Sequence, residues 1–147
     1  MLASLTKPQC ERILLSGMIG RLGCYSSGKV YVVPITYVFE DGYIYAHSRE
    51  GLKTKMMRKN PKVCFQVDQI DTMSNWRSVM LWGKFEELSR AADQEKATKI
   101  LLNRLQPYQI SESVKPPESV PDALPRKEKK PVFYRIHVDE ISGRFEK

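Results

Sequence analysis

The sequence is built from short strand-like segments joined by very short turns, and this feature restricts the fold most. Residues 26–29 (SSGK) and 40–42 (EDG) have the composition of tight hairpin turns, in which glycine adopts a positive φ. The segments beside these turns are rich in β-branched and aromatic residues, which favour strands. The alternation of strand and helix that a doubly wound sheet requires is missing. We therefore expect a mainly β, antiparallel protein.

Six segments are predicted to be strands: 18–25, 30–39, 43–47, 62–68, 76–88 and 131–141. Pro34 lies inside the second segment, which favours an edge position or a bulge there. Gly83 lies inside the fifth, which indicates a bend. A sheet with this many strands avoids exposed, unpaired edges if it curls into a closed or half-closed barrel. The predicted fold is a six-stranded antiparallel split β-barrel with flanking helices.

Three segments are predicted to be helical. The first begins after Thr6, a good N-cap residue with Gln9 at the capping-box position, and ends at Gly17. The others span 51–60 and 91–105, where apolar residues recur at helical spacing. Residues 106–130 contain five prolines and are predicted to form a long irregular segment, either a lid or arm on a partner subunit or a surface loop. The whole chain, 1–147, is predicted to form a single domain.

The composition excludes several classes of protein. Three cysteines without a CxxC pair and two distant histidines do not favour a disulfide framework or a metal site. There is no apolar run of the roughly 20 residues that a membrane helix needs, and the first residues do not resemble a signal peptide. A reducing cytoplasm is therefore expected. The net charge of +7 suggests nucleic acid, an anionic membrane or a phosphorylated ligand as partner.

Residues 45–53 (YAHSREGLK) form the first group with recognisable chemistry, because a strand is followed there by a turn and the start of a helix. Free N–H groups at a helix N-terminus bind phosphate well. Ser48 adds a hydroxyl, Gly51 allows close backbone approach and Lys53 adds a charge. Two interpretations stay open: a phosphate site, or a helix capped by Ser48 with a solvated basic face. His47 serves either in proton transfer or as a structural residue.

Residues 75–83 (NWRSVMLWG) form the second group. On a strand, Arg77 and Val79 share one face and Ser78 shares the other with two tryptophans. Arg77 and Ser78 are candidates for contacting a phosphate or a ring edge; the alternative is an ordinary strand with tryptophans in the core. The sequence has no GxSxG, GxGxxG or Walker A motif.

Taken together in their order, these motifs resemble the FMN-binding split-barrel superfamily. The similarity lies in residues 19–68 (IGRLGCYSSGKVYVVPITYVFEDGYIYAHSREGLKTKMMRKNPKVCFQVD), 75–83 (NWRSVMLWG) and 141–144 (ISGR), and extends over about residues 11–145. The most similar branch contains proteins related to pyridoxamine 5′-phosphate oxidase and to nitroimidazole resistance. True pyridoxamine-phosphate oxidases have a C-terminal arginine that binds pyridoxal phosphate. This sequence has no clear counterpart of that arginine, so the resemblance does not extend to that substrate.

The resemblance implies a homodimer with FMN, or FAD, at the subunit interface. By position, Pro34, Ile35 and Thr36 would line the flavin ring with their backbone. The phosphate group would lie at Ala46, His47, Ser48 and Lys53, and further contacts would come from Arg77, Ser78 and Val79. In the nitroimidazole-resistance branch the histidine of this motif lies near the flavin, which makes His47 the candidate catalytic residue.

The resemblance further implies an oxidoreductase acting on a small molecule, with hydride or electron transfer supplied by the flavin. Reduction of a nitro group with a reduced pyridine nucleotide as donor is one form of this activity. The alternative is a flavin-binding protein without turnover, acting as a store or sensor. A nucleic-acid-binding barrel is the weakest interpretation, because the aromatic residues are not interleaved with the basic cluster as in a stacking platform. No contact with a membrane is expected.

Overall fold

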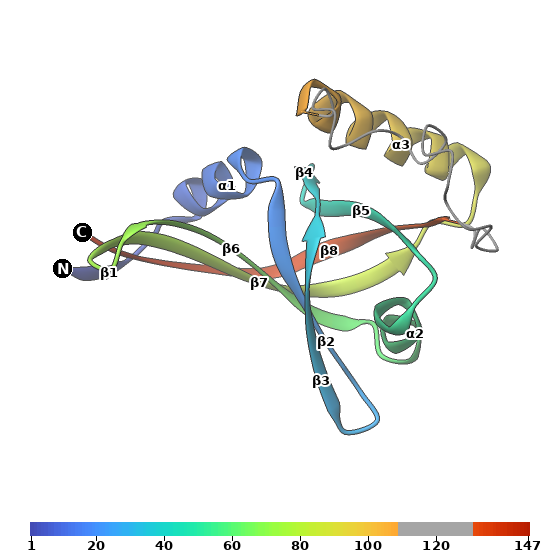
Figure 1. Cartoon of the computed structure of the whole chain (residues 1–147), viewed down its shortest axis with the longest axis horizontal. Coiled ribbons are helices and arrows are strands. Elements are labelled where there is room, and N and C mark those ends of the chain that lie inside the picture. The colour runs from blue at the N-terminus through green and yellow to red at the C-terminus, as the bar shows by residue number, and fades with distance from the viewer. Residues whose placement is uncertain (109–130) are drawn as a thin grey trace, which may run out of the picture.

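The protein is described by a computed structural model, which covers residues 1–108 and 131–147 and shows one antiparallel sheet with three α-helices (Figure 1). The elements are β1 (Leu2–Ser4), α1 (Lys7–Ser16), β2 (Ile19–Ser26), β3 (Lys29–Thr36), β4 (Val38–Glu40), β5 (Tyr43–Arg49), α2 (Leu52–Lys59), β6 (Lys62–Thr72), β7 (Asn75–Glu87), α3 (Ala91–Leu105), the 3₁₀ turn η1 (Gln106–Tyr108) and β8 (Pro131–Glu146). The predicted segment 106–130 lies almost wholly outside the described residues.

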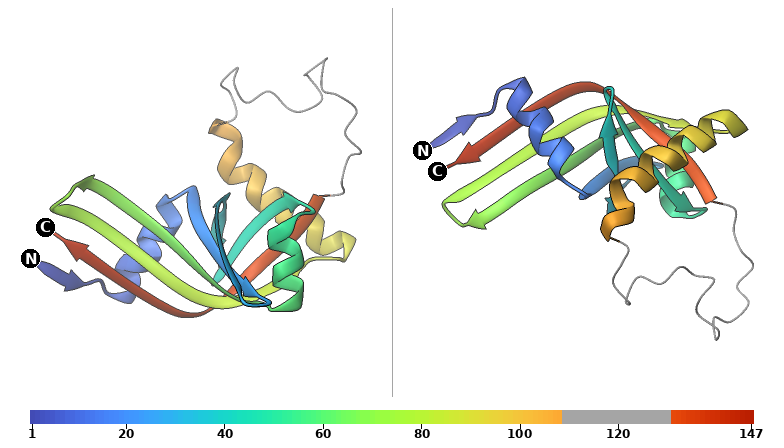
Figure 2. Two further views of the ribbon diagram at one scale, coloured as in Figure 1. Left: turned by 60° about the horizontal axis from the view of Figure 1, so that its bottom comes forward. Right: turned by 90° about the horizontal axis from the view of Figure 1, so that it is seen from above.

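The strand order is β3-β2-β6-β7-β8-β5-β4, with β1 paired to β8, and neighbouring strands are antiparallel. The sheet curves strongly but does not close in the described residues, because β3 and β4 end it on opposite sides (Figure 2). These two strands are consecutive in the chain, so the sheet is split between them. The predicted class, a mainly β protein with a split-barrel-like sheet and flanking helices, is confirmed.

Within the described residues the sheet has eight strands rather than the six predicted, for two reasons. The short strand β1 carries little sequence pattern and forms only by pairing with the end of β8. The predicted strand 30–39 divides at Tyr37, whose ring is fully buried and packs edge-on against Phe65 with ring centroids 4.8 Å apart. The Tyr37 hydroxyl donates to the carbonyl of Leu14 at 2.8 Å, and its amide donates to the carbonyl of Met18 at 3.0 Å. These bonds turn the chain from β3, which pairs with β2, into β4, which pairs with β5.

β6 and β8 extend beyond their predicted ends. β6 continues to Thr72 and β7 begins at Asn75, so that a tight hairpin replaces the expected connection at 71–75. β8 continues past residue 141 to Glu146, because β7 and β1 both supply partners there. Pro34 lies on an edge strand, as predicted, but β2 and β3 stay in register through it, so no bulge forms.

The predicted bend at Gly83 is confirmed. The pairing of β7 with β8 shifts between Trp82 and Gly83, which is the mark of a bulge. A Cβ atom on Gly83 would lie 2.1 Å from the carbonyl oxygen of His137. Glycine is therefore required here by close backbone approach.

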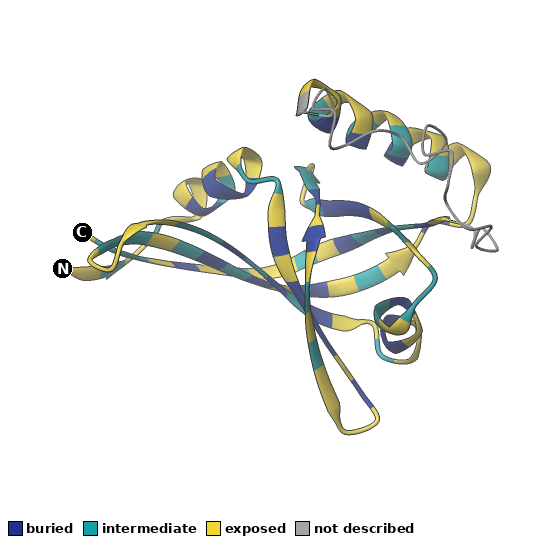
Figure 3. Ribbon diagram, viewed as in Figure 1, coloured by how far each residue is buried: buried dark blue, intermediate teal, exposed yellow. Residues whose placement is uncertain are grey.

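Two apolar clusters make up the core. The first lies on the inner face of the sheet and includes Cys10, Ile13 and Leu14 of α1 with Met56 and Met57 of α2. The second is smaller and lies on the opposite side of β5, where α3 packs. It contains Tyr45, Leu88, Ala97, Leu101 and Leu105. The buried positions of α3 lie on the side of the helix that faces the strands (Figure 3). β5 is thus covered on both faces.

Candidate functional site

The strands sort the predicted site residues onto different faces. Pro34 and Thr36 of β3 lie on the outer face of the sheet, away from the first core, and are exposed, whereas Ile35 between them is buried. Ser78 of β7 lies on this same outer face. Arg77 and Val79 lie on the other face, and Val79 is fully buried in the core. Ser78 and Arg77 therefore cannot act at the same point of one chain.

A chain of polar side chains crosses the outer face from β7 to β2, and we name Arg21, Gln66, Asp68 and Ser78 the outer-face track. Gln66 Nε2 lies 2.9 Å from Ser78 Oγ and 3.3 Å from Asp68 Oδ2. Arg21 Nη1 reaches the same carboxylate oxygen at 3.5 Å. Since Arg21 pairs with Pro34 in the sheet, the track ends beside the predicted ring-binding strand.

The sequence patterns do not single out Arg21, Gln66 and Asp68. Each occupies an alternate position of a strand, which is the ordinary pattern of a solvated sheet face. The alternation places the three on one face, but only the register of β2, β6 and β7 brings them into contact. A correct prediction of the strand order would have found them.

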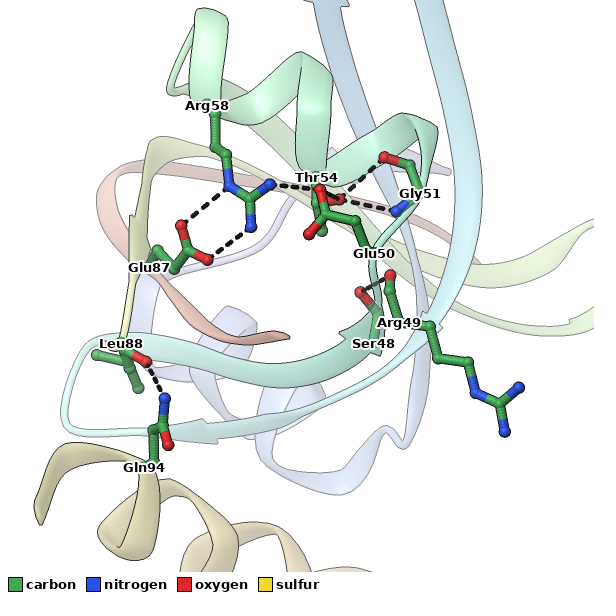
Figure 4. Close-up of polar contacts among 9 residues, drawn as sticks. All are labelled: Ser48, Arg49, Glu50, Gly51, Thr54, Arg58, Glu87, Leu88 and Gln94. Carbon is green, nitrogen blue, oxygen red and sulfur yellow. Dashed lines mark hydrogen bonds and ion pairs between the residues drawn. The ribbon is translucent and has the colours of Figure 1, made fainter. Parts of the chain in front are cut away.

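The second part of the candidate site is the β5–α2 corner, residues 47–53, where β5 ends and α2 begins (Figure 4). Ser48 Oγ donates to the carbonyl of Arg49 at 3.1 Å and so does not cap the helix. The N-cap residue is Gly51, and the side chain of Thr54 in the first turn bonds back to it. Thr54 Oγ1 accepts from the Gly51 amide at 3.0 Å and donates to the Gly51 carbonyl at 2.9 Å. The interpretation of Ser48 as a helix cap is therefore wrong. Ala46, in the middle of β5, is fully buried.

Arg58 holds this corner against the end of β7. Its Nε and Nη2 atoms bind the two carboxylate oxygens of Glu87 at 3.0 and 2.7 Å, and its Nη1 atom binds Glu50 (Figure 4). The hydrogen bond from Arg58 lowers the pKa of Glu50, and Thr54 Oγ1 lies 3.4 Å from the same carboxylate. A bidentate guanidinium–carboxylate pair has fixed geometry. Because Glu50 lies between Ser48 and Lys53, the network holds the turn that carries both.

His47 lies on the face of β5 opposite to the first core. Its ring stacks on Phe133 of β8, with ring centroids 5.9 Å apart and an interplanar angle of 20°. Phe133 also lines a cavity of about 640 Å³ beside Arg58 and Glu87. One side of His47 is exposed, but the surrounding protein makes hydration of the charged form less favourable and lowers the imidazole pKa. A lowered pKa favours the neutral imidazole near pH 7.

This lowered pKa predicts a pH-dependent stability. Because the unfolded chain binds a proton on His47 more readily than the folded chain, the free energy of unfolding falls as the pH drops below about 6.5, the ordinary pKa, and is fully retained above it. In the His47→Gln variant, we expect this fall in the free energy of unfolding to be absent between about pH 7 and pH 5, as measured by urea denaturation. His137→Gln is the matched control, since exposed His137 contacts Asp139 instead. Equal pH profiles for His47→Gln and the parent protein would contradict the assignment.

The structure leaves Arg77 apart from the corner. Arg77 lies near the β6–β7 hairpin, at the end of the molecule that carries both termini, whereas the corner lies beside α2 at the other end (Figure 1). The predicted site residues thus form three groups in one chain: the outer-face track beside β3, the β5–α2 corner, and Arg77 under α1.

Other kinds of site find no support in the part of the chain that the structure describes. Residues 1–108 and 131–147 hold no group of three metal-ligating side chains close enough to share an ion. None of the helices in these ranges has the length and apolar character to span a bilayer.

Comparison with known proteins identifies related chains over nearly the full length. The sequence model of the family described as pyridoxamine 5′-phosphate oxidase matches residues 6–145. The crystal structure of an FAD-binding protein from Mesorhizobium loti is 31% identical, with a TM-score of 0.80, and the match covers 100% of this chain and 99% of that one. An uncharacterised protein of Rhizobium meliloti is 28% identical over 144 residues, covering 95% of this chain and 92% of its own length.

A third similar chain shows the fold alone. It is described as a 5-nitroimidazole antibiotic resistance protein from Bacteroides thetaiotaomicron, and its crystal structure has a TM-score of 0.72 at 20% identity. The match covers 99% of this chain and 87% of that one.

Proposed function

The chain belongs to the pyridoxamine 5′-phosphate oxidase family, and from this premise we propose that it binds a flavin nucleotide and transfers electrons through it. The observation that carries the proposal is the FAD-binding protein of Mesorhizobium loti, which is 31% identical over the whole chain. FMN is the cofactor we propose, with FAD as the alternative that this relative supports.

The β5–α2 corner has the chemistry that a flavin phosphate needs. The first amides of α2 have no partner within the helix and point outward from the positive end of its dipole. The Ser48 hydroxyl and the half-buried Lys53 ammonium lie on either side of these amides in the chain. Gly51 adds backbone with open space around its Cβ position, where the nearest atom is 3.9 Å away. We assign the phosphate to this corner, with Ala46 and His47 supporting it from β5.

The edge strand β3 supports the assignment of the flavin ring to Pro34, Ile35 and Thr36. β3 pairs with β2 alone among the described strands, so its outer backbone groups have no partner strand. The polar edge of an isoalloxazine ring carries both hydrogen-bond donors and acceptors, which such backbone groups satisfy. Ser78 and the rest of the outer-face track lie on the same face and would contact the ring from the side.

A second copy of the chain would complete this site. The outer face carries exposed apolar side chains: Ile19 (58% exposed), Tyr25 (50%), Val30 (70%), Val32 (62%) and Trp82 (42%). The pairings Tyr25–Val30 and Gly23–Val32 place most of them on one surface of β2 and β3. An apolar surface of this kind is typical of an interface between proteins. We propose a homodimer with the flavin at the subunit interface.

The flavin supplies hydride or electron transfer when bound, and the chain supplies position, polarity and exclusion of water. We propose reduction of a small molecule such as a nitro compound, with a reduced pyridine nucleotide as donor. Neutral His47 would hold a proton beside the flavin at pH 7. The alternative is that His47 has a structural role, which its stacking on Phe133 supports. In that case the protein would bind flavin without turnover.

The free thiols Cys10, Cys24 and Cys64 support a location in the cytoplasm.

The absorption spectrum of the purified protein tests the proposal. We expect flavin bands, and chromatography of the cofactor released by denaturation distinguishes FMN from FAD. A colourless protein that takes up neither added FMN nor added FAD would contradict flavin binding. Oxidation of NADH or NADPH in the presence of nitro or quinone acceptors then tests turnover, and a yellow protein inactive with all of them would establish the non-catalytic alternative.

A further inference from the structure

A second hollow in the molecule has the character of an anion site. It lies between α1 and the β6–β7 hairpin and has a volume of about 440 Å³; we name it the α1 pocket. Its polar lining consists of Gln9, Arg12, Ser16, Gln69 and Arg77, and Leu5 and Ile13 form an apolar wall. Ligand pockets are typically a few hundred Å³ in volume with a few polar groups against apolar walls.

The polar groups of the α1 pocket are held in place by their neighbours. Gln9, Arg12 and Ser16 lie on one side of α1, three to four residues apart. Gln69 Nε2 donates to Ser16 Oγ at 3.1 Å, and Ser16 Oγ donates to the Ile13 carbonyl at 3.1 Å. The hydrogen bond between Gln69 and Ser16 joins α1 to β6 at the pocket.

The charge of the pocket is not balanced. Arg21, Arg58 and Arg135 each bind a carboxylate. In contrast, neither Arg12 nor Arg77 has a hydrogen bond or ion pair within residues 1–108 and 131–147, and no carboxylate lines the α1 pocket in these ranges. Two guanidinium groups at one hollow match the two charges of a phosphate ester and bind its oxygens in a bidentate manner.

We propose that the α1 pocket binds the phosphate group of a small phosphorylated ligand, in addition to the flavin. Arg12 and Arg77 bind the phosphate oxygens, and the amide groups of Gln9 and Gln69 supply further hydrogen bonds. The organic part of the ligand lies along Leu5 and Ile13. In one chain, α1 and the β6–β7 hairpin, which line this pocket, lie toward the opposite end of the sheet from α2 (Figure 1).

Titration calorimetry with adenosine 5′-monophosphate as probe tests this site, using the protein as purified with its flavin. We expect Arg12→Gln and Arg77→Gln each to weaken binding at least tenfold, since a hydrogen bond to a charged group contributes about 1.5–3 kcal/mol. The control is Arg90→Gln, which removes the same charge from an exposed arginine at the start of α3, outside the pocket. We expect it to change binding less than twofold. Adenosine should bind much more weakly than the phosphorylated probe, and inorganic phosphate should compete.

Four results would overturn the proposal. They are no detectable binding of the probe to the parent protein, equal binding of adenosine, equal weakening by Arg90→Gln, or loss of flavin from the Arg12→Gln variant. The last result would show that the pocket belongs to the flavin site. Arg12 is exposed on a helix, so its variant keeps the test valid if Arg77→Gln folds poorly. Flavin content, read from absorption, separates failure of this site from failure of the proposed function.

Discussion

Replacing Ser48 and Lys53 together by alanine is expected to lower the affinity for FMN by about 100-fold or more. Lys53 supplies a charge and Ser48 a hydroxyl at the N-terminus of α2, where the helix dipole already favours an anion. Each hydrogen bond to a charged group contributes about 1.5–3 kcal/mol, and the remaining amides retain part of the binding. Fluorescence titration of the cofactor-free variants with FMN measures the change.

The control for this prediction is Lys59→Ala, which removes the same charge from the other end of the same helix. It should change FMN affinity less than threefold, because the dipole and the free amides act only at the first turn. The folded state should persist in the double variant, since the only side-chain hydrogen bond of Ser48 within the described residues goes to the neighbouring carbonyl of Arg49. Unchanged FMN affinity in the Ser48→Ala, Lys53→Ala protein would show that the phosphate lies elsewhere.

The Gly83→Ala substitution is expected to lower the free energy of unfolding by about 3 kcal/mol, a large effect for one methyl group. The added Cβ would lie 2.1 Å from the carbonyl oxygen of His137 and 2.9 Å from Ile136 Cγ2. The first contact is with backbone, so no side-chain rotation relieves it. The β7–β8 bulge would have to open, and these two strands share the longest pairing in the sheet. Urea denaturation measures the loss.

Gly51→Ala provides the matched control for Gly83→Ala. Gly51 has an extended backbone that any residue adopts, and its nearest neighbour to an added Cβ is 3.9 Å away. Because Gly51 is the N-cap of α2, where glycine is preferred to alanine, the same change of side chain should cost about 1 kcal/mol there, well below the loss at Gly83. Equal losses at both positions would show that the clash at Gly83 is relieved by a shift of the strands.

Local patterns were reliable wherever neighbouring residues decide the conformation. Thr6 and Gln9 form the predicted capping box, with the Thr6 amide 2.8 Å from Gln9 Oε1. The hairpin turn at Gly42 adopts the expected positive φ. Local patterns failed at Tyr37, where a strand-like run is divided, because the partner that turns the chain is the carbonyl of Leu14, more than twenty residues away.

The candidate site shows the same division. Residues 45–53 were identified from a strand, a turn and a helix start, all of which are encoded locally. The outer-face track was missed, because Arg21, Gln66 and Asp68 come together only through the order of β2, β6 and β7. The α1 pocket was missed for a related reason: Arg12 and Arg77 are 65 positions apart and meet only when α1 packs over β6 and β7.

By itself, then, the sequence determined the mainly antiparallel class, the three helices and the chemistry of the β5–α2 corner, since periodicity, caps and turn residues act over a few positions. Its resemblance to flavin-binding split barrels supplied the cofactor hypothesis. Only the tertiary structure decided which strands become neighbours, where the sheet stays open and which arginines lack a carboxylate. Those outcomes depend on burial of apolar faces and on the register between distant strands, and neither can be read from short stretches of chain.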